Sequence, residues 1–106
     1  MNYKVYTFTL TQPSGDNPVV SVLESQLCGT VEWTANGNGT VIGTLVGVFP
    51  LGKTKFLFTT DLNNGPAFIS AGRESDDSVS VTGMNISGTP SDGLFNDTLV
   101  EIRIYY

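Results

Sequence analysis

Short segments in which apolar and polar residues alternate recur along the chain, and this pattern restricts the fold more than any other feature. A period of two places successive side chains on opposite faces of an extended strand, whereas a helix requires a period near 3.6. Gly, Pro, Asn and Asp separate the segments, and these residues favour turns. The predicted strands are residues 3–11, 18–25, 30–36, 40–48, 53–61, 67–72, 78–82 and 98–106.

The residue types favour extended backbone as well. Val, Ile and Thr, which are stiff at the first side-chain torsion and suit strands, number 29. The helix-favouring residues Ala, Glu, Gln, Met, Lys and Arg number only 16. We therefore predict an all-β fold, a single domain over residues 1–106, built as an antiparallel β-sandwich or flattened barrel of about eight strands.

Two connections between the strands follow from the sequence. Asn36-Gly37-Asn38-Gly39 supplies the positive backbone torsions of a tight hairpin turn, so residues 30–36 should pair with residues 40–48. Pairing of the first strand with the last is also expected, because it would hold both ends of the chain in place. Gly43 and Gly47 in the fourth segment suggest a bulge or a close neighbouring backbone.

Several kinds of chemistry are disfavoured by composition. The chain has no His and one Cys, so Ser–His–Asp and Cys–His catalysis and a zinc or copper site lack their residues. A net charge of −5 argues against nucleic acid and anionic membranes as partners. No apolar run approaches the roughly 20 residues of a membrane span, and the first residues do not resemble a signal peptide. We expect no cofactor, and we expect Cys28 to be buried.

The acidic residues leave two alternatives open. A pair of carboxylates can hydrolyse glycosides without His, but Asp16, Asp61, Asp92 and Asp97 lie in predicted turns, and Glu32 should face solvent. Catalytic residues are therefore not expected, and the chain is interpreted as non-enzymatic. Calcium needs several oxygen ligands from one loop, and residues 61–64 or the cluster Glu74, Asp76 and Asp77 would have to supply them; exposed polar loops are the favoured interpretation.

The aromatic residues divide into two groups by position. Four lie on periodic apolar faces and are predicted to anchor the core: Phe8, Trp33, Phe56 and Phe58. Tyr3, Tyr105 and Tyr106 lie at the ends of the chain and are the better candidates for exposure. Exposed aromatic rings would suit either a sugar-stacking platform or a contact with a neighbouring subunit.

Some segments carry apolar residues on both faces. This holds for residues 18–23 and 40–48. In addition, Leu57 and Leu99 lie on strand faces that are expected to be exposed to solvent. Strands that are apolar on both faces usually have something covering the second face. Imperfect alternation is one interpretation; the other, which we favour, is an interface with copies of the chain and with a larger protein. The candidate interface residues are Tyr3, Leu57, Leu99, Tyr105 and Tyr106.

Five motifs carry a resemblance to a known group of proteins. They are Leu10-Thr11-Gln12, Val22-Leu23-Glu24, Gly29 to Trp33, Ile42 to Leu45 and Leu99 to Tyr105. Together they resemble small β-rich proteins encoded in tailed phages and prophages of Bacteroidota-type bacteria. The resemblance implies a virion component such as a capsid decoration, head fibre or tail accessory protein, located in the virion or, before assembly, in the bacterial cytoplasm. A carbohydrate-binding module for host-surface glycan is the alternative.

Overall fold

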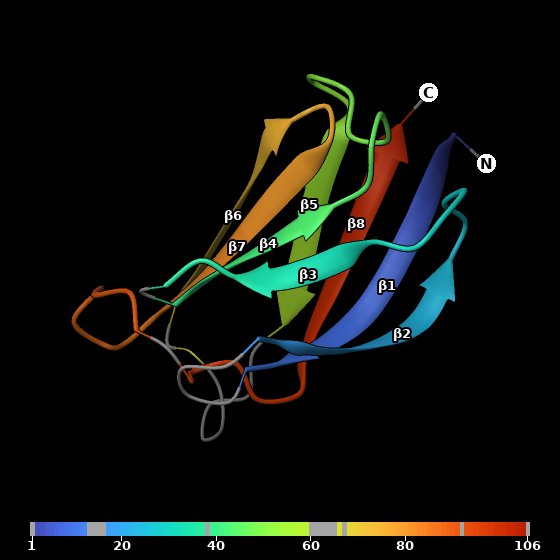
Figure 1. Ribbon diagram of the computed structural model, residues 1–106. Helices are drawn as coiled ribbons and strands as arrows, with labels where there is room; N and C mark the ends of the chain where they lie inside the picture. The colour runs from blue at the N-terminus through green and yellow to red at the C-terminus, as the bar shows by residue number, and fades with distance from the viewer. Residues whose placement is uncertain are drawn as a thin grey trace.

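The chain forms two packed β-sheets. The structure, a computed structural model, describes residues 2–12, 17–37, 39–59, 66, 68–91 and 93–105. Within these residues the strands are β1 (Tyr3–Thr11), β2 (Val19–Ser25), β3 (Glu32–Ala35), β4 (Thr40–Thr44), β5 (Thr54–Thr59), β6 (Phe68–Ser75), β7 (Ser78–Met84) and β8 (Thr98–Tyr105). They form two antiparallel sheets, ordered β2-β1-β8-β5 and β3-β4-β7-β6, which face each other (Figure 1). The predicted all-β sandwich is confirmed.

Both predicted strand pairings are confirmed. β1 pairs with β8 in the middle of the first sheet, from Tyr3 opposite Tyr105 to Leu10 opposite Thr98. β3 pairs with β4 through the Asn-Gly turn, where the backbone N–H of Asn36 donates to the carbonyl of Thr40 at 2.8 Å. The two ends of the described chain therefore lie side by side in Figure 1.

The core lies between the two sheets and follows the predicted alternation on β1, β7 and β8. Their inward side chains are fully buried: Phe8, Leu10, Val79, Val81, Val100 and Ile102. Two further aromatic rings, Phe49 and Phe95, are equally buried although they lie outside the strands. Sequence alternation did not identify these two, because neither belongs to a periodic segment.

The two predicted boundaries with the largest errors were wrong for related reasons. β4 ends at Thr44 rather than residue 48, because the N–H groups of Leu45 and Phe49 donate to the carbonyls of Asp77 and Asp76, both at 2.9 Å. The segment 45–49 thus arches over the β6–β7 turn. β6 extends to residue 75 rather than 72, since it remains paired with β7 up to that turn.

Trp33 packs against the core as predicted. Its ring lies 4.9 Å from that of Phe8, and its Nε1–H donates to the Tyr6 hydroxyl at 3.1 Å. Burial raises the pKa of Tyr6 above its ordinary value of 10.0, so the folded state favours the neutral phenol. This contribution to stability is present below pH 10 and is lost as the pH rises through the raised pKa. The close neighbour of Gly43 is the Trp33 ring rather than a backbone.

Two predicted core positions are exposed. Phe58 has the inward parity, but β5 is an edge strand, so only one neighbouring strand covers this ring and 37% of its surface remains exposed. Cys28 is exposed rather than buried. It lies in the connection between β2 and β3.

Two buried hydroxyls provide a matched test of hydrogen-bond energetics. The Thr98 hydroxyl has no partner among the described residues, whereas that of Thr54 donates to the Pro50 carbonyl at 3.0 Å. Thr98→Val removes an unpaired polar group and should stabilise the protein by about 1 kcal/mol, while Thr54→Val should cost about 1 kcal/mol. Urea unfolding of both variants measures the difference; equal destabilisation would contradict it.

Candidate functional site

A partly apolar hollow lies on the outer side of the first sheet, beside the edge strand β5. Its volume is about 290 Å³, and its lining includes Leu57, Phe58, Leu99, Glu101 and Arg103. The register explains the grouping, because Leu57 lies opposite Glu101 and Thr59 lies opposite Leu99. Leu57 is 44% exposed and Leu99 is 36% exposed, as their outward parity predicted. We call this set the β5-edge surface.

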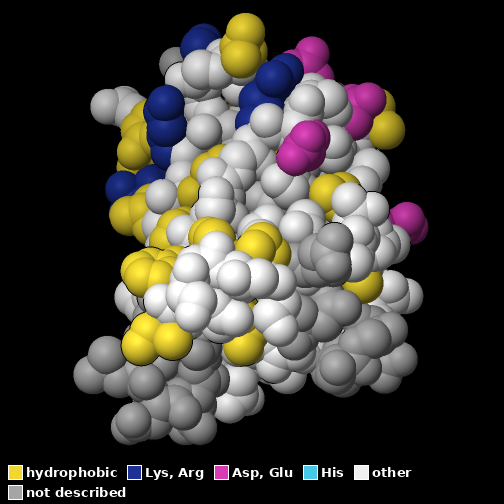
Figure 2. All heavy atoms as spheres, turned by 90° about the vertical axis from the view of Figure 1, so that its left-hand side faces the viewer, with side chains coloured by type: hydrophobic (Ala, Val, Ile, Leu, Met, Phe, Trp, Pro, Cys, Tyr) yellow, Lys and Arg dark blue, Asp and Glu magenta, His cyan; other side chains and the backbone are white. Residues whose placement is uncertain are grey.

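The face that includes strands β5 and β6 is also apolar beyond the hollow. Figure 2 shows hydrophobic side chains across the lower left of that face, with Lys and Arg side chains above them. Phe68 at the start of β6, a strand packed beside β5, is 51% exposed. Exposed apolar area of this kind marks interaction sites when it is contiguous.

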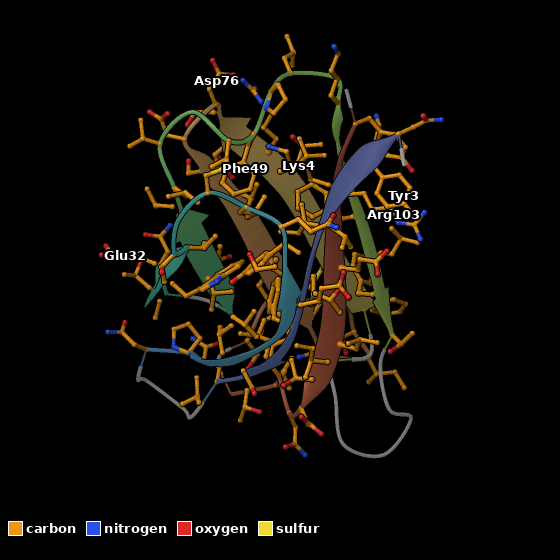
Figure 3. All side chains as sticks on the ribbon, turned by 90° about the vertical axis from the view of Figure 1, so that its right-hand side faces the viewer. Tyr3, Lys4, Glu32, Phe49, Asp76 and Arg103 are labelled. Carbon is orange, nitrogen blue, oxygen red and sulfur yellow. The ribbon has the colours of Figure 1, made fainter. Side chains whose placement is uncertain are left out.

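The predicted tyrosines lie on the same outer face as the β5-edge surface. Tyr3 and Tyr105 are cross-strand neighbours, and their rings lie 5.0 Å apart in a tilted arrangement. The Arg103 guanidinium lies 4.7 Å from the centre of the Tyr3 ring, and Figure 3 shows the two side chains together. Both tyrosines are half-buried by this packing. Tyr106 lies outside the described residues.

Arg103 joins the tyrosine pair to the β5-edge surface. Its Nε–H donates to Glu101 Oε2 at 2.5 Å, and the Thr7 hydroxyl donates to Glu101 Oε1 at 3.3 Å. Hydrogen bonds with Tyr105 and then Glu101 raise the pKa of Arg103 above its ordinary value. The outer face therefore presents fixed positive and negative groups next to apolar side chains.

A second set of exposed apolar side chains lies on both faces of the strand at the opposite edge of the same sheet. On β2, Val19 and Leu23 are each 61% exposed and Val22 is 51% exposed. We call these residues the β2-edge surface. Residues 18–23 were predicted to carry apolar side chains on both faces of their strand, and several of these side chains are exposed. The sheet order β2-β1-β8-β5 separates this surface from the β5-edge surface by the two central strands.

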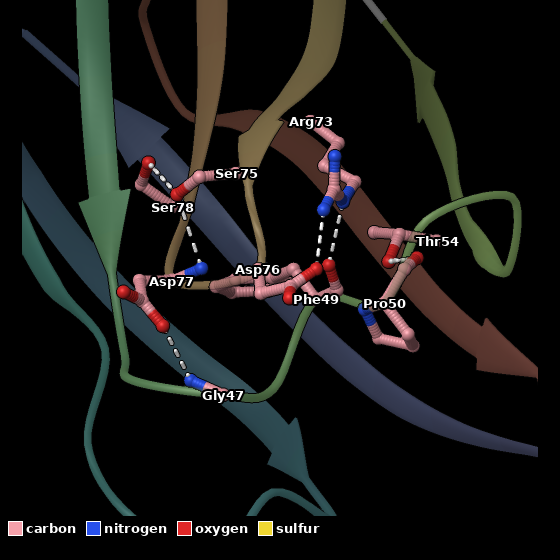
Figure 4. A network of polar contacts seen from close by, with 9 residues as sticks. All are labelled: Gly47, Phe49, Pro50, Thr54, Arg73, Ser75, Asp76, Asp77 and Ser78. Atoms are coloured by element: carbon pink, nitrogen blue, oxygen red, sulfur yellow. Dashed lines mark hydrogen bonds and ion pairs between the residues drawn. The ribbon is translucent and has the colours of Figure 1, made fainter.

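The acidic cluster after β6 serves the fold. Asp76 forms an ion pair with Arg73, whose Nε–H donates to the Phe49 carbonyl at 2.7 Å (Figure 4). Asp77 accepts from the backbone N–H of Gly47 at 2.8 Å, and Glu74 accepts from the Ser80 hydroxyl at 2.7 Å. The bonds of Arg73 and Asp77 hold the arch of residues 45–49 against the β6–β7 turn, and the bond of Glu74 joins β6 to β7.

The remaining acidic positions are dispersed. Glu32 is exposed, as predicted, and Asp97 lies in a turn with a positive φ of 51°. Asp16, Asp92 and the calcium candidates at 61–64 lie outside the described residues. Among the residues that the structure describes, no three acidic or thiol side chains are grouped so as to hold a metal ion.

In the described part of the chain, no helix has the length and apolar character needed to cross a bilayer. Comparisons with protein-family models, with curated proteins and with solved structures give no match to this chain.

Proposed function

We propose that the protein is a non-enzymatic structural module that binds a second copy of itself and a larger protein of a phage virion. The observation that carries the proposal is the pair of exposed apolar surfaces at opposite edges of one sheet. Two separate surfaces allow two neighbours to be bound at the same time. The hydrogen-bonded roles of Glu74, Asp76 and Asp77 support the non-enzymatic part.

The β5-edge surface suits a second copy of the same chain. Leu99, Glu101 and Arg103 follow one another on the outward face of β8. A two-fold axis between Glu101 and Arg103 would place Glu101 of each copy opposite Arg103 of the partner subunit. Such isologous contacts require a surface that is complementary to itself, and this surface has both charges and an apolar part. The β2-edge surface is then left for the larger protein.

The phage setting is supported by the resemblance of the motifs at residues 10–12, 22–24, 29–33, 42–45 and 99–105 to small phage-encoded β-rich proteins. In that setting the module would be a capsid decoration, head fibre or tail accessory protein. Mass spectrometry of purified particles, with the copy number of this chain measured, tests the assignment. Particles that lack the chain would contradict it.

Self-association is tested with Leu57→Thr/Leu99→Thr. Each substitution introduces a β-branched residue, which suits a strand, and removes apolar surface. In a two-fold dimer both copies carry each change, so the loss of apolar contact is doubled. We expect the wild type to dimerise at micromolar concentration, and the double variant to raise the dimer Kd by about 100-fold. Size-exclusion chromatography with light scattering over a concentration series measures this.

Matched controls separate this surface from general surface hydrophobicity. Val46 is 80% exposed and Ile86 is 87% exposed, and both lie outside the strands. Val46→Thr and Ile86→Thr should leave the Kd of the dimer unchanged. A wild type that stays monomeric at millimolar concentration, or a dimer that the double variant leaves intact, would overturn the self-association part of the proposal.

Glycan binding is the second candidate function. The observation that favours it is the tilted Tyr3–Tyr105 pair with Arg103 beside it on the outer face. Half-exposed aromatic rings offer an apolar face to a sugar ring, and their hydroxyls offer polar contacts at its edge. The first candidate rests on the two apolar edges, and Arg103 is the residue that both candidates use.

A further inference from the structure

A hollow of about 300 Å³ lies at the end of the sandwich where β1 begins and β8 ends. Its apolar lining includes Leu27, Val48 and Ile104, and Lys4 and Lys53 also line it. Tyr105 completes the lining on the side of the tyrosine pair. In Figure 3, Lys4 lies toward Phe49 while Tyr3 and Arg103 lie on the other side of β1, so this hollow is distinct from the β5-edge surface.

The backbone that carries Lys53 is held in place. The N–H of Lys53 donates to the Pro50 carbonyl at 3.3 Å, and the following Thr54 hydroxyl donates to the same oxygen at 3.0 Å. On the other side, the carbonyl of Lys53 accepts from the N–H of Tyr105 at 2.8 Å. The turn that presents this lysine is therefore fixed to β8, and the hollow is preformed.

Two lysines line the hollow. Neither Lys4 nor Lys53 forms an ion pair with any described residue. Lys55 follows along β5 opposite Arg103, and Arg103 is paired with Glu101. Arg73, the fifth basic residue of the chain, is paired with Asp76. Charges of one sign beside a concave apolar surface raise the local concentration of opposite charges.

We infer that this hollow binds a carboxylate-bearing sugar, a uronic acid residue of an acidic polysaccharide. Two ammonium groups favour an anionic group, while the apolar lining formed by Leu27, Val48 and Ile104 favours the C–H face of a pyranose. The volume lies at the lower end of ligand pockets, which suits one ring rather than a long acyl chain. The inference rests on the second candidate function, glycan binding, and gives it a ligand class.

The test is an NMR titration of the ¹⁵N-labelled protein with free glucuronate. We expect millimolar binding, with shifts at the amides of Lys53, Ile104 and Tyr105. Lys4→Gln and Lys53→Gln should each weaken binding by about 10-fold, and added salt should weaken it further. Lys55→Gln is the matched control, because this lysine does not line the hollow, and it should weaken binding by less than about twofold.

Three outcomes would overturn the inference. Acetate that binds as tightly as glucuronate would show a simple anion site, and glucose that binds as tightly would show that the carboxylate is not recognised. Absence of shifts at these amides would show that the hollow does not take the sugar. A glycan array separates this failure from failure of glycan binding itself. If the wild type binds neutral glycans on the array and Tyr105→Ala abolishes that binding, the second candidate function stands but the uronic acid is not its ligand.

Discussion

Gly39→Ala is expected to prevent folding at physiological temperature. A Cβ at this position would lie 2.6 Å from the carbonyl oxygen of Ser91, 2.7 Å from the Ser91 nitrogen and 2.8 Å from the carbonyl oxygen of Gly83. All three neighbours are backbone atoms, so no side chain can rotate to make room. At the same place the Gly83 N–H donates to the Gly39 carbonyl at 3.0 Å. Removing the clash would therefore require the β3–β4 hairpin to move away from residues 83–91.

The expected loss is large relative to the stability of a domain of this size. The positive φ of 78° at Gly39 alone costs an alanine about 1–2 kcal/mol. With the backbone displaced as well, the total should exceed about 4 kcal/mol, against roughly 5–15 kcal/mol for a whole domain. Thermal unfolding followed by circular dichroism should show Tm lowered by about 20 °C or more, or no transition at all.

Gly37→Ala is the control for this experiment, because it lies in the same turn. Gly37 has a φ of 75°, but a Cβ there would meet nothing within 4 Å. It therefore carries the torsional strain without the clash, and we expect a loss of about 1–2 kcal/mol. Equal losses for the two variants would show that torsion, and not the approach of the backbone to residues 83–91, requires glycine at position 39.

Gly43→Ala is expected to be the second most damaging change, through overpacking. A Cβ at Gly43 would lie 2.8 Å from two atoms of the Trp33 ring, which is itself held by Phe8 and by the Tyr6 hydroxyl. The ring cannot move without breaking those contacts. We expect a loss of about 2–3 kcal/mol by urea unfolding, near the upper end for inserted methyl groups in a packed core.

A double-mutant cycle isolates this contact. With Trp33→Leu already present, the space opposite Gly43 is open, and alanine should then gain about 0.5–1 kcal/mol over glycine in a strand. Gly72→Ala on β6 is the matched control, because a Cβ there would meet nothing within 4 Å, and it should give a similar gain. Additive losses in the cycle would contradict the assignment to the Trp33 ring.

The sequence was most informative where one face of a strand is buried. On β8, Val100, Ile102 and Ile104 alternate with Leu99, Glu101 and Arg103, and the structure buries the first set and leaves the second at least partly accessible. A period of two is enough for this prediction because a half-buried strand allows only one register. Phe49 and Phe95 were missed because they lie outside the strands. Their burial depends on tertiary contacts, which leave no alternating pattern in the sequence.

The candidate sites were predictable only in part. Outward parity identified Leu57 and Leu99, and the two-sided segment 18–23 identified the β2-edge surface. Phe58 was assigned to the core because parity cannot indicate that β5 lies at the edge of its sheet. The hollow between Lys4 and Lys53 could not be predicted, since its lining comes from four separate segments of the chain. Their proximity depends on the strand order, which the sequence pattern does not contain.

The central position of β1 and β8 in one sheet has a consequence for how the protein is made. The partner of Tyr3 is Tyr105, so β1 cannot form this pairing until β8 has been synthesised. The sheet β3-β4-β7-β6 comprises residues synthesised earlier, and its apolar inner side chains Val41, Val79 and Val81 remain uncovered until then. Folding of the sandwich therefore finishes only after β8 has been synthesised, and the exposed apolar side chains make the nascent chain prone to aggregation before then.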